Sequence, residues 1–484
     1  MNPVLQPDLC ILGGGAGGIS LAVAAASQGL SVVLVEKAQL GGSHLTRTLP
    51  LQALIAASRV APLATVDTSA GTPTRLDFHA TREKMAATLA RSAAEYSQKR
   101  LEALNVSVIR EAGRFTGKDR LTAGHSTIAA HRFVIATGAV EKSLAIPGLE
   151  LVRPLDCAAL CTLSAPPRHL ILLGSDPTGL ALAQALRAFG SEVTVLAESQ
   201  ILPQEDEELC TPVRLHLLRT GVNLHENVRV TRIEPRKSSV RLFLAWSGSE
   251  KLITGSDLLI AAGRMPLVEG LGLKDAGVRY TRQGIETRAD FLTSNRRVHA
   301  IGACVRECPQ DGAAEQQSWL VLRSILGLPQ PLGLGQAVAK VIPTDPPIAI
   351  AGLSEEHARL TERRLHVMRW PLPETDKGRL EPEIHGHVKL LANSRGRLVG
   401  AGIVGRGAEE LIHLCSLALW KGMTASDIAS IMIAYPSLAD AVRRACWAMP
   451  AQKQEWVFKR NMLLFGHWVA ERLKGERNRR EGLS

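Results

Sequence analysis

A glycine-rich turn near the N-terminus constrains the fold of this chain more than any other sequence feature. The turn follows a short apolar segment, residues 9–12, and precedes an apolar helical pattern, residues 19–27. Its glycines occupy the three positions of a GxGxxG pattern: Gly13, Gly15 and Gly18. Glycines let the backbone approach a pyrophosphate, and the free N–H groups of a helix N-terminus favour anions. The spacing predicts a dinucleotide site; the alternative is a tight turn without a ligand.

The unit is completed by a strand over residues 31–35, which ends at Glu36, an acid that can hydrogen-bond a ribose. The same arrangement recurs in the middle of the chain. It consists of a strand over 169–173, a turn with Gly174 and Gly179, and a strand over 192–196. Two such units predict a repeated, doubly wound α/β architecture.

Other segments have simpler patterns. Residues 61–76 are rich in Ala, Thr and Pro and predict a surface loop, and residues 82–104 predict one long helix. Strands are expected to dominate from 197 to 262. Residues 329–335 predict a linker, beyond which strands and helices alternate to about residue 449.

The formal net charge is +11, yet aromatic residues make up only 4% of the chain. No RNA- or DNA-binding signature interleaves aromatic with basic residues, so the charge does not by itself predict a nucleic-acid partner. Part of the charge lies in residues 451–484, where eight Lys or Arg stand against four Glu. This extension carries Trp456 and Trp468 and predicts a basic amphipathic helix. We expect it to pack against the protein; the alternative is peripheral contact with an anionic membrane.

The thiols and the apolar segments point to a soluble, cytoplasmic protein. Eight cysteines in 484 residues form no CxxC pair and no secreted-type framework, so reduced thiols are expected. The longest uncharged stretch, residues 9–35, contains six glycines and is better explained by strand, turn and helix than by a membrane span. Asp8 precedes this stretch where a signal peptide would have basic residues.

The order of the motifs resembles the two-dinucleotide flavoprotein disulfide reductases, the family of dihydrolipoamide dehydrogenase, glutathione reductase and mercuric reductase. The resemblance covers most of residues 8–450. It rests on the two glycine turns and on further motifs in family order: Gly41-Gly42, ATG at 136–138, AGRMP at 262–266, AIG at 300–302 and TDPPIAIAGLSE at 344–355. The segment 179–196 and Tyr435 are most similar to mercuric reductase.

The resemblance implies FAD in the first unit, NAD(P)H in the second, and a C-terminal α+β domain that forms a homodimer. The implied domains are 1–150 and 269–335 for FAD, 151–268 for a nicotinamide dinucleotide, 340–450 for dimerisation, and the extension 451–484. The implied cofactor-binding residues are Gly13, Gly15, Gly18, Glu36, Gly42, Thr137, Gly138, Gly174, Gly179, Glu198, Gly263, Arg264 and Gly302. Tyr435 and Asp440 would complete the active site of the partner subunit.

The redox segment departs from the family. Relatives follow their Gly-Gly pair with two redox cysteines, whereas this chain reads GGSHLTRTLP from Gly41. Aligned with one deletion, the cysteine positions become His44 and Thr48, and neither can form a disulfide or a thiolate. A charged Lys–Glu pair of the family aligns with Gln52 and Ala181. Loss of both partners avoids a stranded buried charge and suggests a reshaped but folded pocket.

Two further departures concern the cofactors. The middle glycine of the second turn is Asp176, whose carboxylate would repel the pyrophosphate of NAD(P)H. Glu198, without an adjacent Arg, favours NADH over NADPH. The acid that usually follows Gly302 and holds the flavin side chain is Ala303, which predicts weaker FAD binding.

Other candidate sites have simpler explanations. Cys304 and Cys308 could supply a replacement dithiol, but buried cysteines usually act as small hydrophobes, and this holds more strongly for Cys157 and Cys161. His385 and His387 share one face of an expected strand, but no further ligands complete a metal site. His44 could exchange a proton during hydride transfer or could pack against the flavin.

The sequence therefore predicts an FAD-dependent homodimeric oxidoreductase that passes hydride or electrons between NADH and a small non-disulfide acceptor such as a quinone. His44, Thr48, Tyr435 and Asp440 are the candidate catalytic residues. No metal and no nucleic acid are expected. The alternative is a degenerate paralogue that keeps the fold and serves as a binding or assembly subunit, which Asp176, Ala181 and Ala303 would favour.

Overall fold

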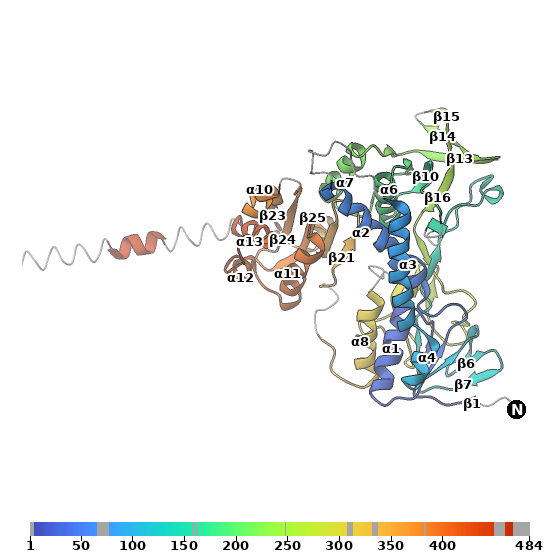
Figure 1. Ribbon diagram of the computed structural model, residues 1–484. Helices are drawn as coiled ribbons and strands as arrows, with labels where there is room; N and C mark the ends of the chain where they lie inside the picture. Colours follow the sequence, from blue (N-terminus) through green and yellow to red (C-terminus); the bar gives the residue numbers. More distant parts are fainter. Residues whose placement is uncertain are drawn as a thin grey trace, which may run out of the picture. The chain divides into compact units, whose positions relative to one another are not determined.

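The computed structural model (Figure 1) describes residues 4–64, 77–156, 159–160, 163–246, 248–306, 313–331, 337–381, 384–449 and 460–467. The chain forms two compact units. The first consists of residues 1–335 and 340–345, and the second of residues 336–339 and 346–484.

A five-stranded parallel sheet forms the first nucleotide fold of the first unit. Its order is β20 (Val298–Ala300), β8 (Arg132–Ile135), β2 (Leu9–Leu12), β3 (Val32–Val35) and β4 (Val106–Ile109). Every residue of β2 and β3 is buried, as expected for strands covered on both faces. Helix α1 (Ala16–Ser27) packs beside α8 (Ala313–Ile325), and both are visible in Figure 1. A Cβ on Gly17 would lie 2.5 Å from the Cβ of Ala314, so the glycine permits this close packing.

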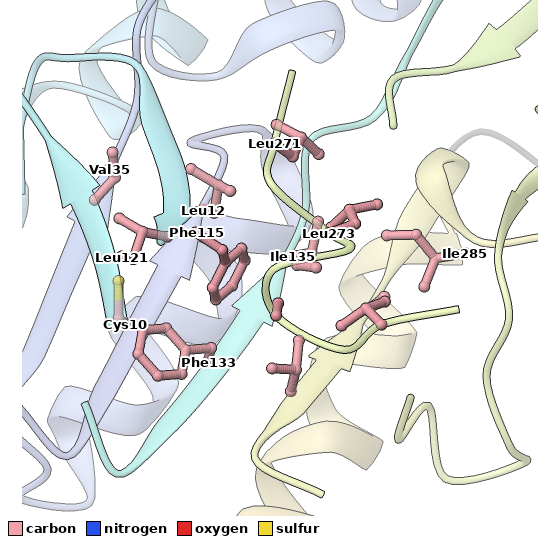
Figure 2. Close-up of a cluster of buried hydrophobic side chains, with 14 of the residues drawn as sticks. Cys10, Leu12, Val35, Phe115, Leu121, Phe133, Ile135, Leu271, Leu273 and Ile285 are labelled. Carbon is pink, nitrogen blue, oxygen red and sulfur yellow. The ribbon is translucent and has the colours of Figure 1, made fainter. Parts of the chain in front are cut away.

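The other face of this sheet is covered by a smaller sheet and by a loop. The small sheet has the order β1 (Val4–Leu5), β7 (Ser126–Ile128), β6 (Arg120–Ala123) and β5 (Gly113–Gly117). Phe115 and Phe133 pack edge to face with ring centroids 5.3 Å apart. Leu271 and Leu273 complete this buried cluster, which Figure 2 shows. A two-stranded sheet, β18 (Tyr280–Thr281) and β19 (Gly284–Ile285), follows.

The segment between β3 and β4 differs from the prediction at two points. A π-helical turn, His44–Thr48, leads into α2 (Leu49–Ala64), so residues 61–64 are helical rather than part of a loop; residues 65–76 lie outside the described residues. The single long helix predicted over 82–104 is also wrong. Two helices form, α3 (Phe78–Glu95) and α4 (Gln98–Ala103), because α3 begins early where the Asp77 side chain caps it and ends at Tyr96.

The second nucleotide fold is a parallel sheet with the order β12 (Asn223–His225), β11 (Glu192–Leu196), β10 (His169–Gly174) and β16 (Asp257–Ala261). Helix α6 (Pro177–Ala188) connects β10 to β11 as predicted. The expectation that strands dominate from 197 to 262 misses α7 (Glu207–Arg219). Two antiparallel sheets accompany this fold: β13 (Arg229–Arg236), β14 (Ser239–Trp246) and β15 (Ser249–Gly255), and the pair β9 (Ala139–Glu141) and β17 (Arg264–Pro266). A strand, β21 (Lys340–Ile342), also belongs to the first unit.

The second unit is built on antiparallel strands in the order β22 (Ile348–Gly352), β25 (Leu398–Gly405), β24 (Gly386–Ala392) and β23 (His366–Pro371). Its helices are α9 (Glu355–Thr361), α10 (Asp376–Leu380), α11 (Ala408–Lys421), α12 (Ala425–Ala429) and α13 (Ala439–Trp447). The predicted α/β class, with two parallel-sheet units and a C-terminal α+β domain, is confirmed. Among the described residues, no helix combines the length and apolar character needed to cross a bilayer.

Candidate functional site

The first glycine turn presents an anion site at the start of α1. The N-cap residue Gly15 makes no side-chain hydrogen bond, and no acidic residue lies in the first turn, so the N-terminal N–H groups of the helix keep their affinity for an anion. Gly13 has φ +115°, and a Cβ there would lie 2.3 Å from the carbonyl oxygen of Ala136. A Cβ on Gly15 would meet no atom within 4 Å, so open space faces the turn. The turn fits a pyrophosphate.

Glu36 closes the turn from the end of β3. Its Oε2 accepts a hydrogen bond from the Gly14 N–H at 2.6 Å, and its Oε1 accepts one from the Ala38 N–H at 2.7 Å. These bonds fix the carboxylate beside the turn, and each oxygen still has a lone pair for a ribose hydroxyl. The structure therefore brings Glu36 to the place that dinucleotide binding requires.

The remaining residues expected to hold FAD lie around this fold. Gly42 has φ +48°, and the adjacent Gly41 donates to the carbonyl of Gly14 at 2.8 Å. The Thr137 hydroxyl donates to the carbonyl of Leu267 at 2.9 Å, and the carbonyl of Gly138 accepts from the N–H of Leu267 at 3.0 Å. These bonds hold the end of β8 against the chain that follows β17.

Gly302 lies at the start of a 3₁₀ turn that also contains Ala303 and Cys304. Its N–H donates to Oε1 of Gln317 in α8 at 2.6 Å, and its φ is +74°. Ala303 is half-buried and offers no polar side-chain atom, so its side chain cannot hold a flavin side chain as the acid of the relatives would. The donor set of the first fold fits FAD at the turn and the ribose, and lacks one contact here.

The redox segment is the π-helical turn His44–Thr48. His44 is half-buried, and its ring lies 5.6 Å from the ring of Tyr96, centroid to centroid, at a tilt of 45°. Thr48 is half-buried and faces a cavity, which Arg47 also lines. Between Cys10 and Cys157 the sequence has no cysteine, so no thiol of this segment can serve as an electron carrier.

The second turn is closed by its own side chain. The Oδ1 atom of Asp176, the N-cap residue of α6, accepts a hydrogen bond from the Gly179 N–H at 2.5 Å. The first helical residue is Pro177, which has no N–H. The sequence predicted that Asp176 would repel a pyrophosphate. The geometry adds that its carboxylate takes up a helix N-terminal donor that an anion would use.

The other nicotinamide-site residues have different surroundings. Gly174 has φ +106°, and a Cβ there would lie 2.2 Å from the carbonyl oxygen of Ala261. Glu198 lies two residues beyond β11 and is exposed. Gly263 has φ +87°, and Arg264 donates from a terminal guanidinium nitrogen to the carbonyl of Ala139 at 2.6 Å.

A cavity of about 680 Å³ lies between the redox segment and the second turn. Four basic side chains and two acidic ones line it: Arg47, Lys142, Arg264 and Lys340, and Asp176 and Glu205. Thr48, the last residue of the π-helical turn, and Gln52 in the first turn of α2 contribute polar groups. Sequence reasoning missed Arg47 and Lys142, because their neighbourhood depends on the packing of two separate nucleotide folds.

Charged groups around this cavity influence one another. The pKa of Glu141 is raised above its usual value because its carboxyl group is partly desolvated and because Asp156 and Asp176 lie nearby. Arg47 and Arg264 act on it in the opposite direction. Arg47 of the redox segment and Asp176 of the second turn therefore act on the same carboxyl group in opposite directions.

A second cavity, of about 370 Å³, lies between α2 and α6. Ala181 lines it, together with Arg59 and Gln184. The Arg59 guanidinium donates to the carbonyl of Thr344 at 2.8 Å, and Gln184 exchanges two hydrogen bonds with the backbone of Asp345. Ala181, which aligns with a glutamate of the relatives, therefore lies on the wall of a cavity.

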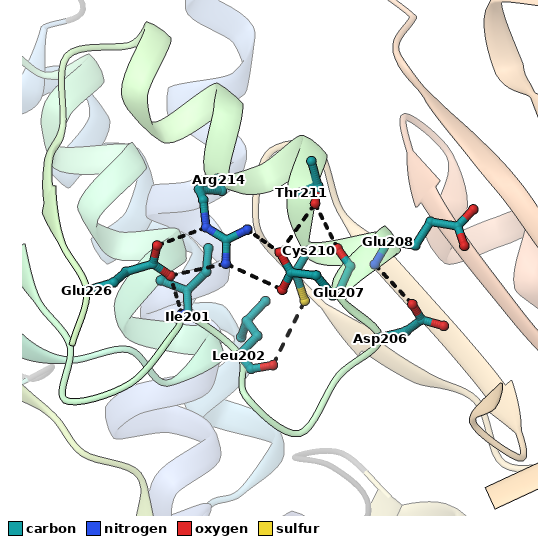
Figure 3. Close-up of polar contacts among 9 residues, drawn as sticks. All are labelled: Ile201, Leu202, Asp206, Glu207, Glu208, Cys210, Thr211, Arg214 and Glu226. Atoms are coloured by element: carbon teal, nitrogen blue, oxygen red, sulfur yellow. Dashed lines mark hydrogen bonds and ion pairs between the residues drawn. The ribbon is translucent and has the colours of Figure 1, made fainter. Parts of the chain in front are cut away.

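A charged network fixes α7 beside the second fold. Arg214 lies between Glu207 and Glu226, as Figure 3 shows, with Nε 2.9 Å from Oε2 of Glu226 and a terminal nitrogen 2.5 Å from Oε1 of Glu207. Glu226 also accepts a bond from the N–H of Ile201 at 2.7 Å. This network supports the loop at 201–205, which forms one wall of the larger cavity.

Tyr435 and Asp440, the two candidates of the second unit, line one hollow of about 620 Å³. Tyr435 is 79% exposed. Asp440 accepts hydrogen bonds from Arg443 at 2.9 Å and from Arg444 at 2.5 Å. Partial burial acts to raise the pKa of Asp440, but these arginines outweigh it and hold the pKa below its ordinary value. Asp440 is thus an ionised, internally paired carboxylate.

The other candidates give no separate site. Cys304 is fully buried in the cluster of Figure 2, with Sγ 3.1 Å from the carbonyl oxygen of Ile301, which matches the structural interpretation. Cys157, Cys161 and Cys308 lie outside the described residues. His385 is exposed and His387 lies in β24. Within the described part of the chain, no group of three or more His, Cys, Asp or Glu residues is arranged to hold a metal ion.

Of the C-terminal extension, the structure describes residues 460–467, which are helical and exposed. Four consecutive side chains, Met462 to Phe465, are each 59–69% exposed. Because consecutive helical residues are about 100° apart, these side chains surround the helix and form no single apolar face. The amphipathic character of the full extension, residues 451–484, stays a prediction.

Most of the chain matches known proteins. A family model for the pyridine nucleotide-disulphide oxidoreductases matches residues 7–318, and the model for the dimerisation domain of that family matches residues 338–446. A mercuric reductase of Lysinibacillus sphaericus is 28% identical over 464 residues, which are 93% of this chain and 83% of that protein. Dihydrolipoyl dehydrogenase 3 of Pseudomonas aeruginosa is 28% identical over 460 residues, covering 90% of this chain and 97% of that protein.

Solved structures agree. LpdA from Mycobacterium tuberculosis has a TM-score of 0.81 and 25% identity, and the match covers 91% of this chain and 99% of that chain. The flavoprotein disulfide reductase RclA from Escherichia coli has the same fold, with a TM-score of 0.79 and 22% identity over 90% of this chain and 98% of that chain. The dimerisation domain supports a homodimer. The chain therefore belongs to the pyridine nucleotide-disulphide oxidoreductase family, whose members are oxidoreductases that use FAD and NAD(H).

Proposed function

We propose that this chain is an FAD-dependent oxidoreductase that takes reducing equivalents from NAD(P)H, with NADH favoured, and passes them to a small non-disulfide acceptor such as a quinone. One observation carries the proposal. The dinucleotide turn at Gly13–Gly18 keeps its open anion site, whereas the redox segment His44–Thr48 contains no thiol. FAD, when bound, supplies hydride and electron chemistry that needs no dithiol.

The residues of this chain would bind and position the cofactor. The α1 N-terminus would hold the pyrophosphate, and Glu36 the ribose. The imidazole of His44 can donate or accept a proton, and its ring lies beside the ring of Tyr96. The hydroxyl of Thr48 can donate one hydrogen bond at the cavity wall. Tyr435 and Asp440 would act in the partner's site.

The second turn limits the binding of NADH. The Asp176 carboxylate occupies a donor at the second turn, and a pyrophosphate placed there would lie beside a like charge. We therefore expect NADH to bind less tightly than it would to a turn with glycine at this position. The exposed carboxylate of Glu198 remains accessible to a ribose hydroxyl, which favours NADH over NADPH.

The same observation favours a second candidate function. If Asp176 blocks the second turn completely, the chain is a degenerate paralogue that keeps the fold, with FAD or without it, as a binding or assembly subunit. The hollow beside Ala181 and the missing acid at Ala303 support this alternative.

Anaerobic titration of the purified protein with NADH separates the two functions. The enzyme predicts a flavin absorption band that bleaches rapidly on addition of NADH and returns when a quinone is added. A coloured protein that stays coloured supports the subunit. Protein that is colourless, and stays empty after incubation with excess FAD, contradicts both the cofactor and the reaction and supports a subunit without FAD.

Peripheral contact with an anionic membrane through residues 451–484 is the alternative to packing of this extension against the protein, and it would suit an acceptor quinone that resides in a bilayer. The +4 charge of this segment and the exposed side chains Met462 to Phe465 support it. Vesicle flotation of the full chain and of a chain that ends at residue 454 tests the contact. Equal flotation of both would eliminate it.

A further inference from the structure

Helices α2 and α6 pack against each other within the first unit (Figure 1), and the cavity of about 370 Å³ lies between their facing sides. Helix α6 lines it with Ala181, Gln184 and Ala188. Spacings of three and four residues place these side chains on one face of the helix. Among the described residues, this α2–α6 cavity shares only Pro343 with the larger cavity at the second turn. It is therefore a separate site.

The walls of the α2–α6 cavity offer apolar surface for a small ligand. Ile55 of α2, Ala181 of α6 and Pro343 contribute apolar side chains. Because Ala181 aligns with a glutamate of the relatives, the cavity of this chain lacks both the volume and the negative charge of that side chain. Its size lies at the lower end of the range for small-molecule sites, which suits a single ring or a short branched chain.

Arg187, in the last turn of α6, brings a fixed positive charge to this cavity. Its Nε donates to the carbonyl of Thr220 at 2.9 Å, and its Nη1 donates to the carbonyl of Ser191 at 3.0 Å. The guanidinium lies against Gly221, where a Cβ would be 3.0 Å from Nη2. Within the described part of the chain, Arg187 makes no ion pair. A guanidinium has five N–H donors, so these bonds leave donors for a carboxylate.

The remaining charged groups on the walls leave positive charge in excess. One carboxylate, that of Asp345, lines the cavity together with the two guanidinium groups of Arg59 and Arg187. Nε2 of His216 lies 3.7 Å from Oδ2 of Asp345. Gln184 exchanges two hydrogen bonds with the backbone of Asp345 and holds this residue beside α6. An anion in the cavity would therefore meet more positive than negative charge.

We propose that the α2–α6 cavity binds a small carboxylate with an apolar ring or branched chain, and that Arg187 holds the carboxylate group. The apolar part would lie against Ile55 and Ala181. This ligand goes beyond the proposed function, since it is neither FAD, NADH nor the electron acceptor. It would touch α2, which follows the redox segment, and α6, which follows the second turn. Binding would therefore favour the arrangement of these two helices that the structure shows.

Isothermal titration calorimetry of the purified protein, without NADH, compares benzoate with benzamide, which has nearly the same shape but no charge. We expect benzoate to bind about tenfold more tightly. R187M should remove this preference, and R187K should keep part of it. A181L leaves the arginine in place but fills the cavity, so it should weaken binding of both compounds. The matched control is R219M, because Arg219 is exposed at the end of α7 and does not line the cavity.

A further variant locates the bound benzoate. Lys142 lines the larger cavity and not this one, so K142Q should leave benzoate binding unchanged. Equal binding of benzoate and benzamide, a preference that survives in R187M, or a loss of benzoate binding in K142Q overturns the inference. If circular dichroism shows that R187M does not fold, unchanged benzoate binding in A181L overturns it instead. The titrations need neither turnover nor NADH, so their result and that of the proposed function are independent.

Discussion

The carboxylate of Asp176 accepts a hydrogen bond from the backbone N–H of Gly179 at 2.5 Å, so the second nucleotide turn of this chain is capped by its own side chain. In the first turn, the corresponding N-cap residue is Gly15, which makes no side-chain bond. Two turns of similar backbone therefore differ in their capacity for an anion. The aspartate at position 176 therefore bears directly on whether a dinucleotide binds at the second turn.

Replacing Asp176 should tighten NADH binding. D176N keeps an oxygen that can cap Gly179 but removes the charge, and we expect the Kd for NADH to fall by about threefold to tenfold. D176G also frees the Gly179 N–H for the pyrophosphate and should lower the Kd further. The lost cap should reduce the stability of α6 by a few tenths of a kcal/mol. Anaerobic titration with NADH, followed by flavin absorbance, measures the change. An unchanged Kd in both variants would show that the carboxylate does not limit binding.

Two substitutions in the first turn should have different consequences. G13A places a Cβ about 2.3 Å from the carbonyl oxygen of Ala136 at a φ of +115°, so the chain should fold poorly. G15A meets no atom within 4 Å and should fold normally, yet its methyl group would occupy the space next to the turn and weaken FAD binding. Circular dichroism and the ratio of flavin to protein absorbance measure the two effects.

The control for these glycines is G117A. Gly117 in β5 also has open space around its Cα, lies outside the turn, and should leave both the fold and the flavin content unchanged. A G15A protein with full flavin content would argue that the dinucleotide does not bind at this turn.

Arg214 should contribute measurably to stability. Its side chain is 18% exposed and that of Glu226 is 19% exposed, so R214M would leave the partly buried carboxylate of Glu226, as well as the 54% exposed carboxylate of Glu207, without its cation. We expect the free energy of unfolding to fall by about 1–3 kcal/mol. Urea denaturation measures this loss. The matched control is R114M, because the Arg114–Asp275 pair is exposed on both sides and should contribute little; equal losses in the two variants would contradict the assignment.

His299 should make the protein less stable in mild acid. Burial lowers the pKa of His299 from 6.5 to about 4, so the unfolded chain binds a proton in this interval that the folded chain does not. Its contribution is therefore unfavourable as the pH falls from about 7 to 5, by about 2 kcal/mol. The urea midpoints measured at pH 7 and at pH 5 should differ less in H299Q than in the natural chain. H125Q, at an exposed histidine, should keep the original pH dependence.

Local sequence determined the elements that carry the dinucleotide chemistry. Strand β2 covers the predicted residues, and α1 ends at the predicted residue, because the apolar runs and the glycines act over a few neighbouring positions. Two predictions from the sequence were wrong although the signals were local. The Asp77 side chain caps α3 and makes it begin earlier than predicted. Helix α7, which Asp206 caps, was not predicted. The absence of thiols between Cys10 and Cys157 is a property of the sequence alone.

Only the tertiary structure decided what the substituted residues do. Asp176 caps Gly179 because the turn brings its side chain back to the helix start, and a charge count cannot distinguish capping from repulsion. Arg47 and Lys142 share a cavity because two nucleotide folds pack together, although 95 positions separate them in the chain. Residue type fixes which bonds a side chain can make, whereas the burial, distance and available partners that determine their strength arise only when remote segments are brought into contact.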